Sequence, residues 1–255
     1  MNAPSANLPA VPRPWTRLVL LHALPLLAGA PWGTTGLAIA FGVIAVVMIR
    51  SIAFPHGWFF GRARRSFPAT GKKMLYLTID DGPTDDTPAM LEVLESHQAK
   101  ACFFLIGDRA AASPDLARAI TEAGHQIGNH TRSHPATTFW AMPPSAQRRE
   151  IREGNQMIAA TSGQSPRWFR APVGLLGPFL PALVREQGLG LLGWNARGFD
   201  TRRRDPESIV RAILAGLMPG SIILLHQGHA HSVATLELLI KRCREDGWEF
   251  SLLPE

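Results

Sequence analysis

Residues 75–83 read Leu-Tyr-Leu-Thr-Ile-Asp-Asp-Gly-Pro, an apolar segment that runs straight into two carboxylates and a turn. The β-branched, aromatic and aliphatic side chains of Met74–Ile79 are typical of a buried strand, and the Gly-Pro pair turns the chain at its end. Because side chains alternate along a strand and diverge at a turn, we expect Asp80 and Asp81 to have different roles. Taken alone, the acidic pair would fit a solvated turn equally well, so its chemistry depends on the rest of the chain.

Strand-like and helix-like segments alternate along the rest of the chain. Helix signals, in which Pro or a capping residue precedes an apolar face, occur at residues 87–97, 114–123, 145–161, 181–187, 206–217 and 233–246. Strand-like runs occur at residues 101–106, 125–129, 168–169, 189–194, 221–225 and 248–252. This alternation predicts an α/β fold, a parallel sheet with helices outside it that is either open or closed into a barrel.

Polar residues follow the predicted strands at one edge of that sheet. They are Asp80, Asp81, His130, Arg170, Asn195 and His226. In parallel α/β folds functional groups collect at the carboxyl ends of the strands. The sequence therefore predicts one shared site at this edge.

Charge divides the chain into two regions. Met1–Lys73 contains no Asp or Glu but eight Lys and Arg residues, which leaves 18 of the 26 basic side chains for the rest of the chain against all 20 acidic ones. The net charge of +6 thus belongs to the N-terminal region, which argues against nucleic acid as a partner of the folded domain. Cys102 and Cys243 lie in apolar patterns that predict buried thiols rather than a disulfide or a metal site.

The N-terminal region is expected to anchor the protein in a membrane. Residues 18–49 contain no Asp, Glu, Lys or Arg, a longer stretch than the roughly 20 residues that one membrane-spanning helix needs. Gly29–Gly33 reads as a turn within this stretch. We therefore favour a helical hairpin over about residues 16–52, inside a membrane-anchoring region of residues 1–66, and leave a single span as the alternative.

Arginine residues on both sides of the apolar stretch distinguish these topologies. In a hairpin, both basic flanks lie on the same face of the inner membrane, as the positive-inside rule requires, and the domain faces the cytoplasm. With a single span, the arginines after residue 49 are translocated and the domain is periplasmic. A cleaved signal peptide fits less well, since the apolar stretch is long and lacks a clear cleavage site. A core helix of a soluble protein remains a reasonable alternative for the first segment only.

Two histidines four residues apart, His130 and His134, are candidate metal ligands. On a helical turn such residues share a face and can bind one metal ion. A catalytic metal usually takes a third protein ligand, often a carboxylate, and Asp81 or Asp80 can supply it. The histidine pair alone is a weak signal, because histidine is also common at surfaces and helix ends.

Five motifs in order closely resemble the NodB-like polysaccharide deacetylases, carbohydrate esterase family 4. They are Thr-Ile-Asp-Asp-Gly-Pro at 78–83, Phe-Phe-Leu-Ile-Gly at 103–107, Gly-His-Gln-Ile-Gly-Asn-His-Thr-Arg-Ser-His-Pro at 124–135, Arg-Ala-Pro-Val-Gly at 170–174 and Leu-Leu-His at 224–226. The resemblance implies a distorted (β/α) barrel of the NodB-homology type at residues 73–255. It also implies a hydrolase that acts on linear amide carbon–nitrogen bonds of glycans.

The resemblance assigns a divalent metal to the site, zinc first, with Co²⁺, Ni²⁺, Mn²⁺ or Fe²⁺ as alternatives. Its implied ligands are Asp81, His130 and His134, whereas Asp80 becomes the catalytic base. The physical logic agrees, since a metal can acidify a water whose proton the neighbouring carboxylate takes.

Four further residues receive roles from the same resemblance. His226 is the general acid for the departing amine, and Arg170 pairs with the base. Leu224 lines the pocket for the acyl methyl group, and the backbone N–H of Val173 holds the oxyanion. Asp200 matches the acid that buttresses the arginine.

The chain departs from the family pattern at several positions. Val173 stands where the family usually has Tyr, which changes the pocket wall but not the backbone N–H. The stretch Trp194–Asp200 lacks one of the expected acids, and Gln227 stands where Asp is common. His229 and His231 read as polar loop residues rather than ligands.

The sequence thus predicts a metal-dependent deacetylase for the N-acetyl, or N-formyl, group of an amino sugar in a membrane-associated or lipid-linked glycan. A periplasmic domain would instead favour peptidoglycan or an exported polysaccharide as substrate. A catalytically silent carbohydrate-binding protein of the same fold is the alternative from another functional class.

Overall fold

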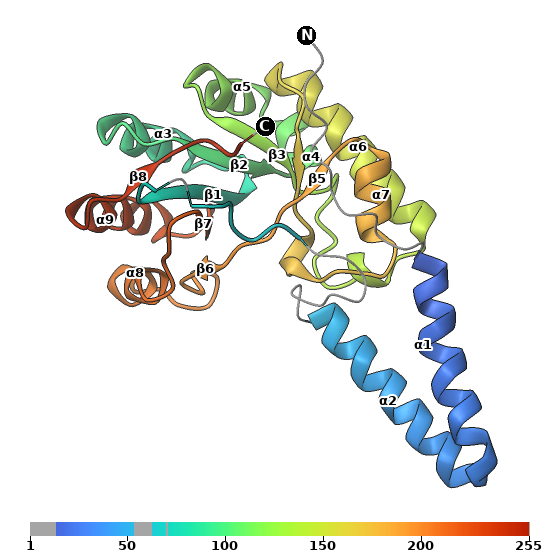
Figure 1. Ribbon diagram of the computed structural model, residues 1–255. Coiled ribbons are helices and arrows are strands. Elements are labelled where there is room, and N and C mark those ends of the chain that lie inside the picture. Colours follow the sequence, from blue (N-terminus) through green and yellow to red (C-terminus); the bar gives the residue numbers. More distant parts are fainter. Residues whose placement is uncertain (1–13, 54–62, 70, 255) are drawn as a thin grey trace.

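The computed structural model describes residues 14–53, 63–69 and 71–254, which form an apolar helical hairpin and an α/β domain (Figure 1). One sheet runs in the order β5-β4-β3-β2-β1-β7-β6, with β8 paired to β1, and its strand pairs are parallel. The predicted parallel α/β fold is confirmed, as a curled half-barrel. The strands are β1 (Met74–Gly82), β2 (Ala101–Leu105), β3 (Gln126–Asn129), β4 (Trp168–Phe169), β5 (Gly190–Leu191), β6 (Ala196–Arg197), β7 (Ser221–His226) and β8 (Glu249–Phe250).

Most helices of the domain begin where the sequence offers a matching signal. Pro lies in the first turn of most of them, Asp205 caps α8 by accepting a hydrogen bond from the backbone N–H of Ser208, and α6 ends at Gly163 with φ 73°. The helices are α3 (Thr87–Ser96), α4 (Gly107–Ala112), α5 (Pro114–Glu122), α6 (Pro144–Ser162), α7 (Leu180–Glu186), α8 (Pro206–Leu214) and α9 (Ser232–Glu245).

Alternation along β1 separates packing from chemistry. Leu75, Leu77 and Ile79 join the main hydrophobic core with apolar side chains of α3, α8 and α9. Burying each such aliphatic side chain, relative to leaving it in water, stabilises the fold by about 1.5–3 kcal/mol. The intervening residues Thr78 and Asp80 therefore face the concave side of the sheet, where function is expected.

Three short elements differ from the sequence expectation. The run 189–194 forms a strand only at β5, and β6 and α4 have no counterpart among the predicted elements. Leu192 forms a bridge with Arg64, and the N–H of Gly193 donates to the Arg64 carbonyl, so a segment before the domain completes this sheet edge. Such long-range pairing leaves no periodic signal in the sequence.

Residues 63–67 belong to the edge of the domain. Ala63 and Phe67 are buried in it, and Ser66 bridges to Ser221. The sequence boundary placed residues up to 66 in the membrane-anchoring region, and these contacts refine that boundary for Ala63–Ser66. Residues 54–62 lie outside the described residues.

The apolar N-terminal segment folds as α1 (Pro14–Gly29), a 3-10 turn (Ala30–Trp32) and α2 (Gly33–Ala53), and Figure 1 shows the two helices side by side next to the turn. A Cβ at Gly36 would lie 2.2 Å from the Gly29 carbonyl oxygen, so glycine permits the close contact. Exposed apolar side chains cover the outside: Val19, Leu20, Leu24, Leu27, Trp32, Ile39, Phe41, Val43, Val46 and Ile49.

This hairpin contains the candidate membrane span Val19–Val47, with a mean hydropathy of 1.7. The 21 residues of α2 extend about 32 Å at 1.5 Å per residue, close to the thickness of a bilayer core. Its length and apolar exterior are therefore suited to lipid. The number of spans and the side on which the domain lies stay predictions.

Candidate active site

Asp80 and Asp81 lie side by side at the carboxyl end of β1, where the register shifts between Asp80 and Gly82. Asp81 adopts φ 71°, a left-handed conformation that turns its side chain away from the strand alternation. As a result, both carboxylates approach one imidazole: Nε2 of His130 lies 3.7 Å from Asp80 Oδ2 and 3.5 Å from Asp81 Oδ1.

The two histidines lie on a loop, not on the helical turn that their spacing suggested. Asn129 Oδ1 accepts a hydrogen bond from the N–H of Thr131, and Thr131 Oγ1 accepts one from the N–H of His134. Thr131 and His134 have φ of 73° and 55°. These side-chain bonds to the backbone fold the loop so that the rings still meet, with centroids 4.8 Å apart.

The surroundings of each imidazole favour a metal ligand. The Arg170 carbonyl lies 2.8 Å from Nδ1 of His130 and accepts a hydrogen bond from it, so Nε2 is the nitrogen that faces Asp80 and Asp81. Burial, together with the neighbouring His130, lowers the pKa of His134 to about 4, so that ring is neutral at pH 7. Neutral imidazole nitrogen is the form that binds a metal.

Asp81, His130 and His134 fit a divalent metal. Their candidate ligand atoms all lie within 4.8 Å of one another. The buried Asp81 Oδ1 has no hydrogen-bond partner among the described residues, although it faces His134 Nε2 at 3.3 Å. Two imidazoles and one carboxylate with room for a further ligand form a donor set typical of catalytic zinc.

Arg170 holds Asp80 from the other side. It is fully buried, and its guanidinium donates to Asp80 Oδ1 at 2.6 Å, to Thr78 Oγ1 at 2.8 Å and to the Gly193 carbonyl at 3.0 Å. Its Cζ also lies 4.3 Å from the ring centroid of Phe104. The buried charge pair is thus held in one geometry by contacts from β1, from β2 and from the segment after β5.

His226 follows Leu225 on β7 and pairs in register with Asp80. Asp200 accepts hydrogen bonds from the backbone N–H of His226 at 2.6 Å and from its Nδ1 at 3.0 Å. Burial lowers the pKa of His226, but the hydrogen bond and charge of Asp200, with the charges of Asp80 and Asp81, outweigh it, so the pKa is raised. This environment favours a protonated imidazole.

Asp200 therefore does not buttress the arginine as the resemblance implied. Its carboxylate is engaged by His226, and its backbone oxygen lies 2.9 Å from His231 Nε2. The preceding Phe199 has φ 59°, and this left-handed turn directs Asp200 to β7 instead of to Arg170. A turn of this kind at a Phe is not encoded in any motif that the sequence offered.

The structure places Val173 at an exposed turn and Leu224 in the buried part of β7. Val173 is 54% exposed and has φ 49°, whereas Leu224 is buried on the concave face of β7. The next residue, Gly174, contacts Trp194 so closely that a Cβ would lie 2.4 Å from the indole. The Trp194 ring also faces the Arg170 guanidinium, whose Cζ lies 5.6 Å from the ring centroid.

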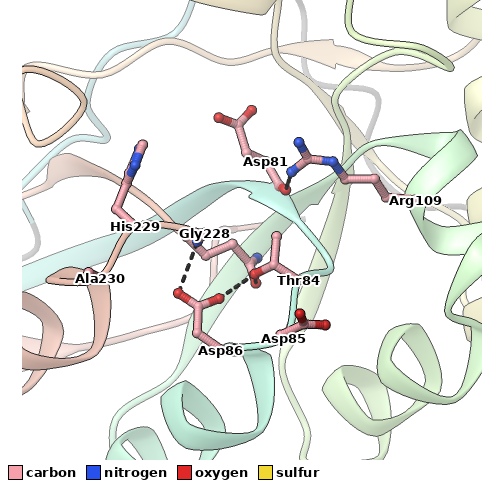
Figure 2. Close-up of a pocket in the computed structure, with 9 residues that line it drawn as sticks. Asp81, Thr84, Asp85, Asp86, Arg109, Gly228, His229 and Ala230 are labelled. Atoms are coloured by element: carbon pink, nitrogen blue, oxygen red, sulfur yellow. Dashed lines mark hydrogen bonds between the residues drawn. The ribbon is translucent and has the colours of Figure 1, made fainter.

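An open cavity of about 490 Å³ adjoins Asp81 (Figure 2). Arg109 donates to the backbone carbonyl of Asp81, and Asp86 accepts bonds from Thr84 Oγ1 and from the N–H of Gly228. These contacts tie the loop after β1 to the loop after β7. The cavity is lined by Asp81, Thr84, Asp85, Asp86, Arg109, Gln227, Gly228, His229 and Ala230.

Sequence reasoning missed two of the residues that support the site. Thr78 was identifiable as a lone polar residue inside an apolar strand, two positions before Asp80 and hence on its face. Arg109 lies on the unexpected helix α4 and carried no signal. His229 and His231 stack on each other, with ring centroids 5.5 Å apart, and lie outside the metal-ligand group among the described residues.

Comparison with known proteins decides the family. Residues 68–190 match the sequence profile of polysaccharide deacetylases. A chitooligosaccharide deacetylase of Sinorhizobium fredii is 35% identical over 201 residues, which cover 73% of this chain and 93% of that protein. The chain belongs to the polysaccharide deacetylase family. It is therefore a hydrolase of amide carbon–nitrogen bonds.

Other polysaccharide deacetylases share both sequence and fold with this chain. A peptidoglycan-N-acetylglucosamine deacetylase of Bacillus cereus is 32% identical and covers 72% of the chain and 68% of that relative. A solved peptidoglycan N-acetylglucosamine deacetylase superposes with a TM-score of 0.70 at 31% identity over 75% of this chain and 91% of that one. A carbohydrate esterase family 4 pseudoenzyme of Bacillus anthracis superposes with a TM-score of 0.69 at 26% identity over 74% of this chain and 66% of that one.

Proposed function

We propose that the protein is a metal-dependent deacetylase that hydrolyses the N-acyl amide of an amino sugar in a membrane-associated or lipid-linked glycan. One observation carries the proposal: the carboxylate of Asp80, held by Arg170 and outside the candidate ligand group, lies beside two imidazoles and a second carboxylate at the same sheet edge. Base and ligands are thereby supplied together, which is the arrangement that metal-assisted amide hydrolysis requires.

Asp81, His130 and His134 are the residues that would hold the metal, which when bound supplies Lewis acidity toward the amide carbonyl and a water. Asp80 takes a proton from the attacking water as the water oxygen adds to the acyl carbon. Arg170 compensates the charge of Asp80 in this buried position and fixes its second oxygen toward the imidazoles.

Val173 and His226 serve the later steps. The backbone N–H of Val173 donates to the oxygen that becomes negative when the acyl carbon turns tetrahedral. His226, held by Asp200 through Nδ1, gives its Nε2 proton to the amine as the carbon–nitrogen bond breaks. Leu224 supplies an apolar contact for the methyl group of an acetyl substrate.

Deacylation of an N-acetylchitooligosaccharide tests this assignment. Full-length protein should lose turnover with a chelator and regain it with Zn²⁺, and Asp80→Asn should lower turnover by about 100-fold to 10,000-fold. Asp115→Asn, at a carboxylate whose side chain is 94% exposed on α5, is the matched control and should retain full turnover. Unchanged turnover in the Asp80→Asn protein would refute the mechanism.

The lipid-linked substrate follows from the hairpin. A domain held at the inner membrane by α1 and α2, on the side of its flanking arginines, meets glycans attached to lipid carriers before it meets finished wall polymers. Labelling a tag at the C-terminus in intact and in permeabilised cells tests on which side of the inner membrane the domain lies. A tag reached only from the periplasm would shift the proposal to peptidoglycan or an exported polysaccharide.

A catalytically silent carbohydrate-binding role is the second candidate, because a family pseudoenzyme with the same fold exists. The retention of Asp80 together with all three candidate ligands favours turnover here. Glycan binding without any acyl release, in zinc-loaded protein, would instead support the silent role.

A further inference from the structure

We propose that Arg197, assisted by Arg65 and Arg202, binds a phosphate group of the substrate beside the reacting amide. This inference rests on the proposed deacetylase function and names the chemistry of its substrate, an acylamino sugar carried on a phosphate ester. Arg197 stands within the stretch Trp194–Asp200, at which the chain departs from the motif that it otherwise resembles.

Arg197 lies on the concave face of the sheet. It pairs in register with Leu224, and the adjacent Ala196 pairs with Ile223, whose side chain joins the main core. Since side chains alternate along both strands, Arg197 and Leu224 share the face that carries His226. Leu224 and His226 are two positions apart along β7, a spacing of about 7 Å, which is comparable with one pyranose ring and its glycosidic oxygen.

The guanidinium of Arg197 is held against two aromatic rings, one of which Arg170 also approaches. Its Cζ lies 5.8 Å from the ring centroid of Trp194, the same ring that Arg170 approaches, and 4.1 Å from that of Phe199. The segment between Trp194 and Phe199 is tightly packed, because a Cβ at Gly198 would lie 2.4 Å from Ile209 of α8. The arginine is therefore carried by a tightly packed segment on the same face of the sheet as His226.

A cluster of positive charge surrounds Arg197 without a compensating carboxylate. Burial and the charge of Arg197 lower the pKa of Arg65, and burial and the charge of Arg202 lower the pKa of Arg197. Within the described parts of the chain, no carboxylate forms an ion pair with any of these three guanidinium groups. Like charges held together in this way favour an anion among them.

Phosphate matches this cluster better than a single carboxylate. Guanidinium groups bind phosphate oxygens with paired hydrogen bonds, and several of them can share one phosphate. Arg65 belongs to the segment that joins the membrane hairpin to the domain, and its Nε donates to the Trp194 carbonyl at 2.8 Å. The cluster thus lies where the chain comes from the membrane, as a phosphate-linked lipid substrate would require.

Two matched probes test the proposal. One is N-acetylglucosamine 1-phosphate esterified to a short alkyl chain, and the other is the alkyl glycoside with the same chain and no phosphate. Full-length protein in nonionic detergent should show at least about tenfold higher kcat/KM for the phosphate probe, mainly through KM. The ratio should fall as salt increases.

Substitutions locate the effect. Arg197→Gln should bring the ratio of kcat/KM values close to one, Arg197→Lys should leave an intermediate ratio, and Arg202→Gln should lower it less. Arg118→Gln, at an exposed arginine on α5, is the matched control and should preserve the ratio. A ratio near one in the unmodified protein, or a ratio that Arg197→Gln does not change, overturns the proposal.

Calorimetric binding of the same probes separates this proposal from the proposed function. If neither probe is deacylated, the proposed function fails, while tighter binding of the phosphate probe that is lost in Arg197→Gln still supports the anion site. Equal affinity for both probes overturns the anion site even where both are deacylated.

Discussion

The candidate active site has a buried half and an open half. The side chains of Asp80, His130 and Arg170 are between 0 and 3% exposed, whereas those of Asp81, His134 and His226 are between 17 and 23% exposed. In the buried half, Arg170 donates three hydrogen bonds, one of them to Asp80 Oδ1, although its Nε has no partner among the described residues. In the open half, Asp81 Oδ1 lacks a hydrogen-bond partner among the described residues.

This difference separates two physical tasks. The buried half uses protein contacts to fix the charge and direction of the base, so its disruption should affect stability and turnover together. The open half keeps ligand positions for a metal and substrate, so its disruption should affect binding and turnover with little cost in stability. Four substitutions can test this division, beginning with the largest expected effect.

Arg170→Met removes the partner of a buried carboxylate. We expect the free energy of unfolding to fall by about 3–5 kcal/mol, since Asp80 would be left charged and buried, and turnover to be lost. Denaturant unfolding and a deacetylation assay measure the two effects. Arg148→Met, at an arginine of α6 in an exposed pair with Glu186, should cost less than about 1 kcal/mol. Equal costs at the two arginines would contradict the buried half as defined here.

Asp81→Asn should separate metal binding from folding. Zinc at 100 times its dissociation constant should stabilise the native protein by about 2.7 kcal/mol, and this increment should vanish in the variant together with turnover. The metal-free variant should unfold at nearly the temperature of the metal-free parent, because Asp81 Oδ1 has no hydrogen bond to lose. Thermal unfolding with and without zinc measures this difference. If zinc still stabilises the Asp81→Asn protein by the same amount, Asp81 is not a ligand.

Asp200→Asn should move the pH profile without removing a reacting group. Asp200 raises the pKa of His226, so its loss lowers that pKa, and the alkaline decline of kcat should begin at lower pH. The stability contributed by the pair is present in full below pH 6.5, the ordinary pKa of histidine, and is lost as pH rises through the raised pKa. An alkaline limb that does not shift would show that His226 is not the acid.

The sequence predicted the parts of this centre that depend on short-range signals. The strand before Asp80, the order of strands and helices, and the position of His226 after an apolar run follow from alternation and turn residues. The motifs then identified the same side chains that the structure brings together at one sheet edge. Local periodicity was sufficient because parallel strands place their carboxyl ends on one side.

Long-range geometry was beyond these signals. The partner of Asp200 depended on a left-handed Phe199, and the histidine loop depended on side-chain bonds of Asn129 and Thr131 where the spacing suggested a helix. The Arg64 bridge to Leu192 joined residues distant in sequence. At Phe199, and at Thr131 and His134 of the histidine loop, the backbone adopts left-handed conformations that the local residue preference does not favour.

Val173→Gly is the smallest and most selective test of the open half. Val173 is exposed and held at φ 49°, which is strained for a β-branched residue, so Gly should stabilise the protein by about 1 kcal/mol after its own entropy cost. Its backbone N–H is kept, and turnover should change far less than the roughly 100-fold loss expected when an oxyanion donor is removed. Unfolding and kcat measured together give the answer. A loss of turnover near 100-fold would assign the role to the valine side chain, and the wall of the open half would then be as specific as the buried base.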